Sequence, residues 1–357
     1  MSLPSIPDYS SCIKMPTLLL PQLLNGGHPI EKGTRLIKYS GGFCVVFPYE
    51  TATRKYAIRC WHAEISNAKR RTQIISEALK NSQLPYFVGF EFYEDGIRTP
   101  QGLQPIVVMD WVEAQPLKKY LSEHLEESNV INEIAENFKK MVSDLHACHL
   151  SHGDLQHGNI MINSDRSLVL VDYDSMYVPK LKGMPDEIKG LVGYQHEARW
   201  KNKFASEKAD YFSELVIYLS LKALAKRPSL WTRLNMADTD TLLFSGDDIR
   251  SKGSANIFNE LRTDLDLAPL VDKLCEFMGK TSIDDLMPLE EAIVSKAENI
   301  SSKWKCSNGY IGVSSNSCID DTEKIIKKWR GGNGYVKPDK NEQYKKIALS
   351  ISKKIKS

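Results

Sequence analysis

Residues 152–160 read HGDLQHGNI, and residues 168–174 read LVLVDYD. Asp154 and Asn159 lie in the first stretch, and Asp172 follows the apolar run of the second. Metal-assisted phosphoryl transfer needs a carboxylate near the attacking hydroxyl, and hard oxygen ligands that hold Mg²⁺ against the nucleotide phosphates. A loop with Asp154 and Asn159, followed by a strand that ends at Asp172, can provide all of these groups.

The segments around this loop follow a regular order. Residues 138–146 carry apolar side chains at helical spacing, residues 160–162 form an apolar strand, and residues 163–167 form a polar turn before a second strand. A chance polar turn between strands is the alternative explanation for an isolated Asp and Asn. The order helix, loop, hairpin and Asp resembles the catalytic loop and the metal-binding triplet of the protein-kinase superfamily.

This resemblance implies a fold and a set of roles. The fold would be α+β and bilobal, with a small β-rich N-lobe, a larger helical C-lobe, and ATP with Mg²⁺ bound between the lobes. Asp154 would orient or deprotonate the acceptor hydroxyl. Asn159 and Asp172 would hold the Mg²⁺ ion.

Residues 39–47 read YSGGFCVVF, which predicts a strand, a glycine turn and a second strand. The turn is similar to the loop with which kinases cover the nucleotide phosphates, because glycine lets backbone N–H groups approach phosphate oxygens. The resemblance implies nucleotide contacts from Gly41, Gly42 and Val46. Only Gly41 is in register with a family glycine, and Cys44 stands where another would be. An ordinary Gly-Gly hairpin turn is the alternative.

Residues 55–61 read KYAIRCW and are similar to the family strand that carries a phosphate-binding lysine. Arg59 occupies the lysine position, and Ala57 would contact the nucleotide. Glu77, in a helical segment at residues 71–79, stands where the family places the lysine's carboxylate partner. The resemblance implies that Glu77 holds Arg59 against the α- and β-phosphates, which a guanidinium binds bidentately. A strand-edge Arg and a solvated Glu are the alternative.

Residues 105–112 read PIVVMDWV, a predicted buried strand that continues into a linker. In register with the other motifs, this stretch looks like the hinge between the two kinase lobes. Met109 would lie behind the adenine ring. Backbone hydrogen bonds to the adenine would come from Asp110, Trp111 and Val112.

The region after Asp172 contains two further family features. Residues 193–197 read GYQHE and resemble the end of the kinase activation segment. Asp210 opens an apolar helix and matches the buried aspartate that braces the catalytic loop, a role that needs several N–H donors to offset desolvation. Met287 stands where the family's Arg partner of Glu197 would lie, so this pairing is predicted to be absent or rebuilt.

The sequence also predicts how the activation segment is regulated. Gly153 replaces the family Arg whose charge an activation-loop phosphate neutralises. Between residues 175 and 195, only Ser175, Tyr177 and Tyr194 could accept a phosphate. Activity is therefore predicted not to require phosphorylation of this segment.

Composition is that of an ordinary globular protein. The chain has 357 residues, of which 42% are hydrophobic and 26% charged, and its net charge is +2. This charge gives no reason to expect nucleic-acid or membrane binding, and no apolar run approaches membrane-spanning length. Seven scattered cysteines without a C-x-x-C pair favour reduced thiols in a cytoplasm over disulfides or a zinc site.

Four segments are predicted along the chain. They are an N-terminal extension at residues 1–33, the N-lobe at residues 34–110, the C-lobe at residues 111–297, and a C-terminal extension with a basic tail at residues 298–357. The tail is loosely consistent with an amphipathic helix. Docking of such a helix on the domain is favoured over binding of a polyanion.

Three functions are compatible with these motifs. The first is a serine/threonine protein kinase of the type that bacteria and their phages encode. The second is a pseudokinase, a nucleotide-binding scaffold or regulator without transfer, which Arg59, the sparse glycine loop and Gln156 favour. The third is a small-molecule phosphotransferase, because antibiotic phosphotransferases commonly share the H-G-D loop. Asp210 and Glu197 favour the first, with a protein as substrate or regulatory partner, and the oligomeric state is open.

Overall fold

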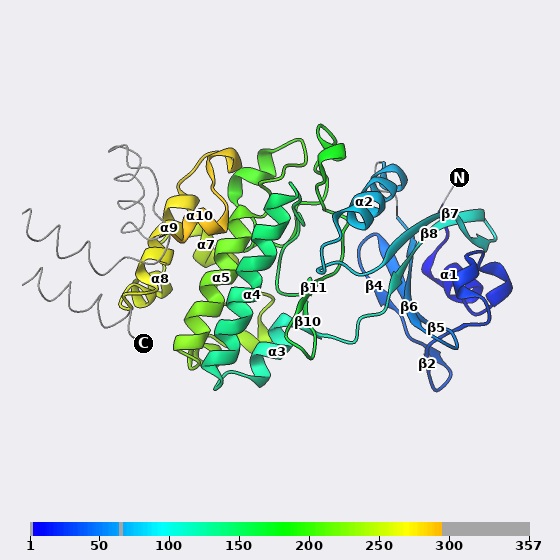
Figure 1. Ribbon diagram of the computed structural model, residues 1–357, viewed down its shortest axis with the longest axis horizontal. Coiled ribbons are helices and arrows are strands. Elements are labelled where there is room, and N and C mark those ends of the chain that lie inside the picture. Colours follow the sequence, from blue (N-terminus) through cyan, green and yellow to red (C-terminus); the bar gives the residue numbers. More distant parts are fainter. Residues whose placement is uncertain (1–2, 64–66, 295–357) are drawn as a thin grey trace, which may run out of the picture. The chain divides into compact units, whose positions relative to one another are not determined.

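A computed structural model describes residues 3–63 and 67–294, and Figure 1 shows how their elements are arranged. The chain divides into two units, Met1–Ser295 and Lys296–Ser357. The predicted C-terminal extension at residues 298–357 lies outside the described residues. None of the helices that are described is long and apolar enough to cross a membrane.

The N-lobe is built on an antiparallel sheet. Its strands follow the order β1-β5-β6-β8-β7, and β4 also pairs with β5. Their bounds are β1 (His28–Pro29), β4 (Tyr39–Ser40), β5 (Cys44–Glu50), β6 (Lys55–Trp61), β7 (Phe90–Thr99) and β8 (Gly102–Asp110), and a separate hairpin pairs β2 (Glu31–Lys32) with β3 (Arg35–Leu36). Helix α2 (Ala68–Ser82) packs on β7, where the Ser76 hydroxyl donates to the Phe90 carbonyl at 2.6 Å.

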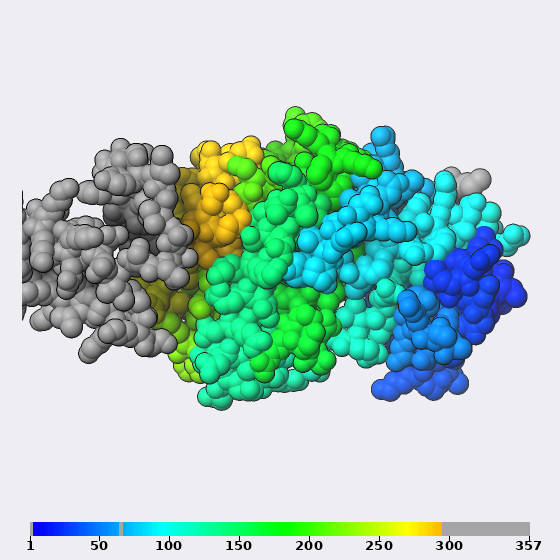
Figure 2. Space-filling view, in the orientation of Figure 1, coloured from blue at the N-terminus to red at the C-terminus, as the bar shows by residue number. Residues whose placement is uncertain are grey.

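One face of this sheet packs against the N-terminal segment. The segment forms α1 (Ile6–Cys12) and the 3-10 helices η1 (Pro16–Leu18) and η2 (Gln22–Leu24). Its side chains Tyr9, Ile13 and Leu24 share a hydrophobic cluster with Phe47 and Ile58 of the sheet. Figure 2 shows this dark-blue segment at the end of the N-lobe that lies away from the helical lobe. The predicted extension is thus an integral part of the N-lobe, and its strand β1 pairs with β5.

One strand of the N-lobe sheet, β7, is not among the strands predicted from the sequence. Residues 87–104 hold the whole of β7 and the start of β8. Acidic side chains at Glu91, Glu94 and Asp95 hide the apolar alternation typical of a strand. A register shift between Tyr93 and Ile97 breaks the alternation further.

The C-lobe is built around two long helices, α4 (Ser128–Ala147) and α5 (Tyr211–Lys226), which pack on each other. Helix α5 is buried on nearly all sides, as expected for a helix at the centre of a lobe. The further helices are α3 (Leu117–Glu123), α6 (Leu230–Arg233), α7 (Gly246–Arg250), α8 (Asn256–Leu261), α9 (Ala268–Met278) and α10 (Leu289–Ala292). Three of these short helices, α6, α7 and α8, lie between residues 225 and 265.

A small sheet lies where the C-lobe meets the N-lobe (Figure 1). Its strands are β9 (Gln115–Pro116), β10 (Ile160–Ile162) and β11 (Leu168–Leu170), with β10 in the middle. The predicted hairpin after the catalytic loop is therefore confirmed. The predicted α+β, bilobal fold with a β-rich N-lobe and a helical C-lobe is confirmed as well.

Candidate functional site

The catalytic loop is fixed by a buried carboxylate at the start of α5. Asp210 is 2% exposed, and its oxygens accept hydrogen bonds from the backbone N–H groups of His152 and Gly153. Two N–H donors on one carboxylate offset its desolvation. The bracing contact predicted for Asp210 is present.

Gly153 has a backbone conformation that favours glycine. Its φ is +78°, and a Cβ at this position would overlap the carbonyl oxygen of Ser175. The carbonyl oxygen of Gly153 accepts a hydrogen bond from Nη1 of Arg199, a fully buried side chain. A guanidinium therefore reaches the catalytic loop from residue 199, although the loop contains no Arg of its own.

Asp154 and Asn159 are in direct contact within the loop. Nδ2 of Asn159 donates to the Asp154 carbonyl oxygen at 2.9 Å and to its Oδ2 at 3.2 Å. Burial raises the pKa of the Asp154 carboxyl above its ordinary value, and the charge of nearby Asp172 acts in the same direction. A raised pKa makes this carboxylate a better proton acceptor.

Asn159 and Asp172 are the two candidate metal ligands, and their segments lie side by side. The Val171 N–H donates to the Asn159 carbonyl oxygen at 3.0 Å, and the Asp172 side chain is 53% exposed. Because Nδ2 of Asn159 donates to Asp154, its Oδ1 is the atom that could bind a cation. Within residues 3–63 and 67–294, no cluster of three or more His, Cys, Asp or Glu side chains could hold a metal. Asn159 and Asp172 offer one amide oxygen and one carboxylate, and such oxygen donors fit Mg²⁺ that is completed by phosphate and water oxygens.

Arg59 pairs with the residues after β11 and not with helix α2. Its Nη2 forms an ion pair with Asp174 and lies 3.5 Å from Oδ1 of Asp172, and its side chain is 7% exposed. The predicted pair of Arg59 with Glu77 is wrong. Glu77 is half-exposed and accepts a hydrogen bond from Lys180 at 3.3 Å. The physical reason is the phase of α2, whose buried residues are Arg71, Thr72, Ile75 and Leu79, so that Glu77 lies on another side.

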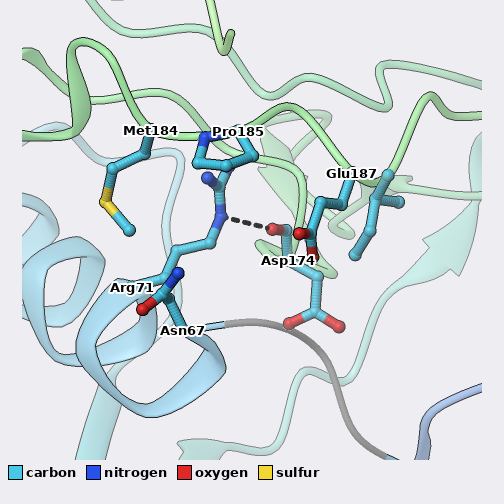
Figure 3. A pocket seen from close by; sticks show the side chains of 7 residues that line it. Asn67, Arg71, Asp174, Met184, Pro185 and Glu187 are labelled. Carbon is cyan, nitrogen blue, oxygen red and sulfur yellow. Dashed lines mark hydrogen bonds between the residues drawn. The ribbon is translucent and has the colours of Figure 1, made fainter. Parts of the chain in front are cut away.

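Helix α2 nevertheless contacts the segment after β11, through a different residue. Nε of Arg71 donates to the Asp174 carbonyl oxygen at 2.9 Å, and its Nη2 donates to the Met176 carbonyl oxygen at 2.6 Å. Figure 3 shows the Arg71 side chain running from α2 towards Met184 and Pro185, with Asp174 and Glu187 beside it. The small cavity at this place is thus lined by both lobes.

The predicted nucleotide residues of the N-lobe lie on one face of the sheet. Strand register pairs Val46 with Arg59 and Ala57 with Met109, and residues two apart in a strand point to the same side. The glycine turn joins β4 to β5, and Gly41 and Gly42 are exposed. A Cβ at either glycine would meet no atom within 4 Å, but the Gly41 N–H already donates to the Cys44 carbonyl at 2.9 Å.

The hinge offers fewer hydrogen bonds than predicted. The Asp110 N–H donates to the Gly89 carbonyl and the Trp111 N–H donates to the Lys55 carbonyl, each at 3.1 Å. These two donors are therefore used within the protein. Among the hydrogen bonds of the described residues, the Val112 N–H takes part in none, so it is the hinge donor that suits an adenine.

The activation segment is held by an internal ion pair. Nε and Nη2 of Arg199 donate to the two carboxylate oxygens of buried Asp186 at 3.1 and 3.2 Å, and Lys189 donates to the same carboxylate at 3.1 Å. Glu197 is exposed and pairs with Lys252 at 3.4 Å, so an exposed ion pair with a lysine stands in place of the family's Glu–Arg pair. The segment is therefore fixed by Asp186 and not by Glu197.

The same segment also lies against the candidate base. The Leu191 N–H donates to Oδ1 of Asp154 at 2.9 Å. Gly190 has a φ of +77°, and a Cβ there would lie 2.5 Å from Asp154 Oδ1. One of the two oxygens of Asp154 is thus covered by the protein's own backbone.

Four side chains of the site were given no role in the sequence-based predictions, namely Arg71, Asp174, Asp186 and Arg199. Asp174 stands in the quoted stretch VDYD, and a second acidic residue so close to a metal ligand was a usable signal. Arg71, Asp186 and Arg199 occupy no family motif position, and their roles depend on tertiary contacts that a single sequence does not carry.

Comparison with known families agrees with this geometry. Residues 101–182 match the family described as ABC1 atypical kinase-like domain. The α+β, bilobal fold agrees with this match. The match covers the hinge, the catalytic loop and Asp172, and it supports a place in the protein-kinase-like superfamily, with ATP and a divalent metal as the ligands such a domain implies. A comparison with curated proteins finds no match.

Proposed function

We propose that this protein binds ATP with Mg²⁺ between its lobes and transfers the γ-phosphoryl group to a serine or threonine hydroxyl of a protein. One observation carries the proposal. Asn159 donates a hydrogen bond to Asp154 within one loop, and Asp210 accepts hydrogen bonds from the backbone of that loop. Asp172 lies on the adjoining segment. Carboxylates that are costly to bury and that share one site are typical of catalytic positions.

The residues of this chain would divide the work as follows. Bound ATP with its metal supplies the activated phosphoryl group. Asp154 orients the acceptor hydroxyl and accepts its proton, and Asn159 and Asp172 hold the metal. Arg59 binds phosphate oxygens. Its buried Nε has no hydrogen-bond partner, which fits a site that is completed by an anionic ligand.

A protein acceptor is supported by the segment between the metal triplet and α5. This segment, residues 173–199, is anchored at Asp186 and ends in the Glu197 region, and small-molecule phosphotransferases with the H-G-D loop lack such a segment. The Ser151 and Tyr177 backbones pair in both directions, at 3.2 and 2.9 Å, so the segment begins in register with the catalytic loop.

The five cysteines within the described residues are free thiols, which supports a cytoplasmic location.

One observation favours a second function, a pseudokinase that binds nucleotide and acts as a regulator. The hydrogen bond from the Leu191 N–H to Oδ1 of Asp154 occupies one of the two oxygens that could accept the proton of an acceptor hydroxyl. Such a protein would bind Mg²⁺-ATP but transfer nothing.

The test is incubation of the intact protein with γ-labelled ATP and Mg²⁺, with a generic protein substrate present. Label on serine or threonine in the parent, and none with Asp154→Ala, is the expected result. Mg²⁺-ATP binding without any label would support the pseudokinase instead. Label that reaches only an added aminoglycoside-type amino sugar would support a small-molecule phosphotransferase.

A further inference from the structure

We infer that Arg71 is the positioning residue through which helix α2 fixes the metal-binding segment, the task that the kinase resemblance implies for Glu77. The inference rests on the proposed function, because the segment that Arg71 holds begins at the candidate metal ligand Asp172. Arg71 is 9% exposed, whereas Glu77 is half-exposed and pairs with Lys180 outside the site.

The geometry of Arg71 suits a rigid clamp. Its two hydrogen bonds end on the carbonyl oxygens of Asp174 and Met176, two residues apart in the chain. A planar guanidinium with donors in a fixed fork can hold both carbonyls at once, and a lysine ammonium on a flexible stem cannot do so in the same way. The backbone from 174 to 176 therefore follows any movement of α2.

Charge around Arg71 supports the same role. Burial lowers the pKa of the Arg71 guanidinium, and the carboxylates of Asp186, Asp174 and Glu187 oppose this effect. The guanidinium stays charged because an arginine pKa begins far above neutrality. Two backbone carbonyls accept the hydrogen bonds of this buried cation, and the nearby carboxylates favour its charge.

The contacts also link Arg71 to the nucleotide side of the site. The Asp174 carbonyl oxygen accepts a hydrogen bond from Arg71, and the Asp174 carboxylate forms an ion pair with Arg59. Nη2 of Arg59 also lies 3.5 Å from Oδ1 of Asp172. The N-lobe thus supplies two arginines and the C-lobe supplies the acceptors. Arg71 and Arg59 therefore both bind Asp174, two residues from the candidate metal ligand Asp172.

The experiment compares Arg71→Met and Arg71→Lys with Arg70→Met, a matched control one position away on the exposed side of α2. Three quantities are measured on the full chain: the melting temperature, the amide exchange of a peptide that covers residues 172–176, and ATP affinity with and without Mg²⁺. Outer-shell changes at metal sites typically weaken metal binding by about 10-fold or more.

We expect the Mg²⁺-dependent gain in ATP affinity to fall by about 10-fold in both Arg71 variants. Exchange at residues 172–176 should become faster, and Arg70→Met should match the parent in every measurement. Arg71→Lys keeps the positive charge. If it loses Mg²⁺-dependent ATP affinity as Arg71→Met does, the hydrogen bonds to the two carbonyls matter and the charge alone is not sufficient.

Unchanged exchange at residues 172–176 in a folded Arg71→Met protein would overturn the inference. A parent that binds no Mg²⁺-ATP would refute the proposed function, and the exchange measurement would still decide the role of Arg71. A fall in ATP affinity that is equal with and without Mg²⁺, together with unchanged exchange, would show that Arg71 supports only the lobe as a whole and would also overturn the inference.

Discussion

Arg59 of β6 is ion-paired with Asp174, two residues beyond the candidate metal ligand Asp172. The guanidinium is therefore held by the C-lobe, from the segment that would bind the metal. Arg59 lies 3.5 Å from Asp172 as well, so one side chain touches both carboxylates of the stretch VDYD. This arrangement gives Arg59 a defined position without any help from Glu77.

The first prediction concerns this pair. Arg59→Lys should lower phosphoryl transfer by about 100-fold, because a shorter ammonium cannot keep Arg59's place between Asp174 and the phosphates, and small misplacements are costly. Glu77→Gln should leave transfer within about twofold of the parent, since exposed ion pairs contribute little. Initial rates with γ-labelled ATP measure both. A Lys variant faster than the parent would show that Arg59 is a defect and not an adapted phosphate ligand.

The second prediction concerns phosphorylation of the activation segment. Protein treated with a phosphatase should keep its full rate, because Asp186 already supplies the negative charge that Arg199 and Lys189 bind. The three possible acceptors Ser175, Tyr177 and Tyr194 are at most 7% exposed, so a second kinase could not reach them in the folded protein. Mass spectrometry of the active protein checks their state.

A matched pair of variants tests the role of Asp186. Asp186→Asn should destabilise the protein by about 3–5 kcal/mol, because it leaves the buried Arg199 without its ion pair. The exposed neighbour serves as the control, and Glu187→Gln should be close to neutral. Urea unfolding gives both values, and equal stabilities would contradict a structural role of this pair.

The third prediction concerns Gly153. Gly153→Ala should lower the free energy of unfolding by more than about 2 kcal/mol. The positive φ is strained for alanine, and the new Cβ would also overlap the Ser175 carbonyl. Gly183 has a φ of +84°, but a Cβ added there would meet no atom within 4 Å, so Gly183→Ala isolates the backbone strain. Thermal unfolding of the two variants compares them. Equal losses would show that the approach of Ser175 has no energetic weight.

The fourth prediction concerns stability at alkaline pH. Nε2 of His146 contacts Glu214 at 2.8 Å and its Nδ1 contacts Glu290 at 3.0 Å, which ties α4 to α5 and α10. Burial alone would lower the pKa of His146, but the two carboxylates outweigh it and raise the pKa to about 9. The folded pKa thus lies above the ordinary value of 6.5.

The charged imidazolium therefore stabilises the fold fully below pH 6.5, and this contribution is lost as the pH rises through about 9. The loss should amount to roughly 3 kcal/mol. In His146→Gln, the free energy of unfolding should be nearly flat over this range, whereas His149→Gln, at an exposed position, should follow the parent. A parent profile without any decline between pH 6.5 and about pH 9 would contradict the ion pair.

The position of the loop at residues 152–160 was predictable because its signals are local. The spacing of Asp154 and Asn159, the hairpin and the strand before Asp172 all lie within about twenty residues, and each is read from the chain directly. Asp210 was predictable for a similar reason, since it begins an apolar helix at a family position. The hairpin at residues 160–170 followed from its two apolar runs and the polar turn between them.

The rest depends on how helices and loops dock. Glu77 lies at the expected distance in sequence from Arg59, but α2 buries the side that holds Arg71, and only tertiary packing sets that phase. The pairing of Asp186 with Arg199 joins two segments that carry no shared pattern. Strand β7 was missed because its acidic residues and its register shift interrupt the alternation that predicts a strand.

The central claim is that Asp154 acts in phosphoryl transfer on a nucleotide held by its neighbours. The most direct measurement is single-turnover transfer from γ-labelled Mg²⁺-ATP in the parent and in Asp154→Asn, with ATP affinity measured on the same samples. The account predicts that transfer falls by about 10²–10⁴-fold, the usual contribution of a positioned acid–base group, while ATP affinity stays close to that of the parent. An Asp154→Asn protein that transfers phosphate as fast as the parent would contradict it.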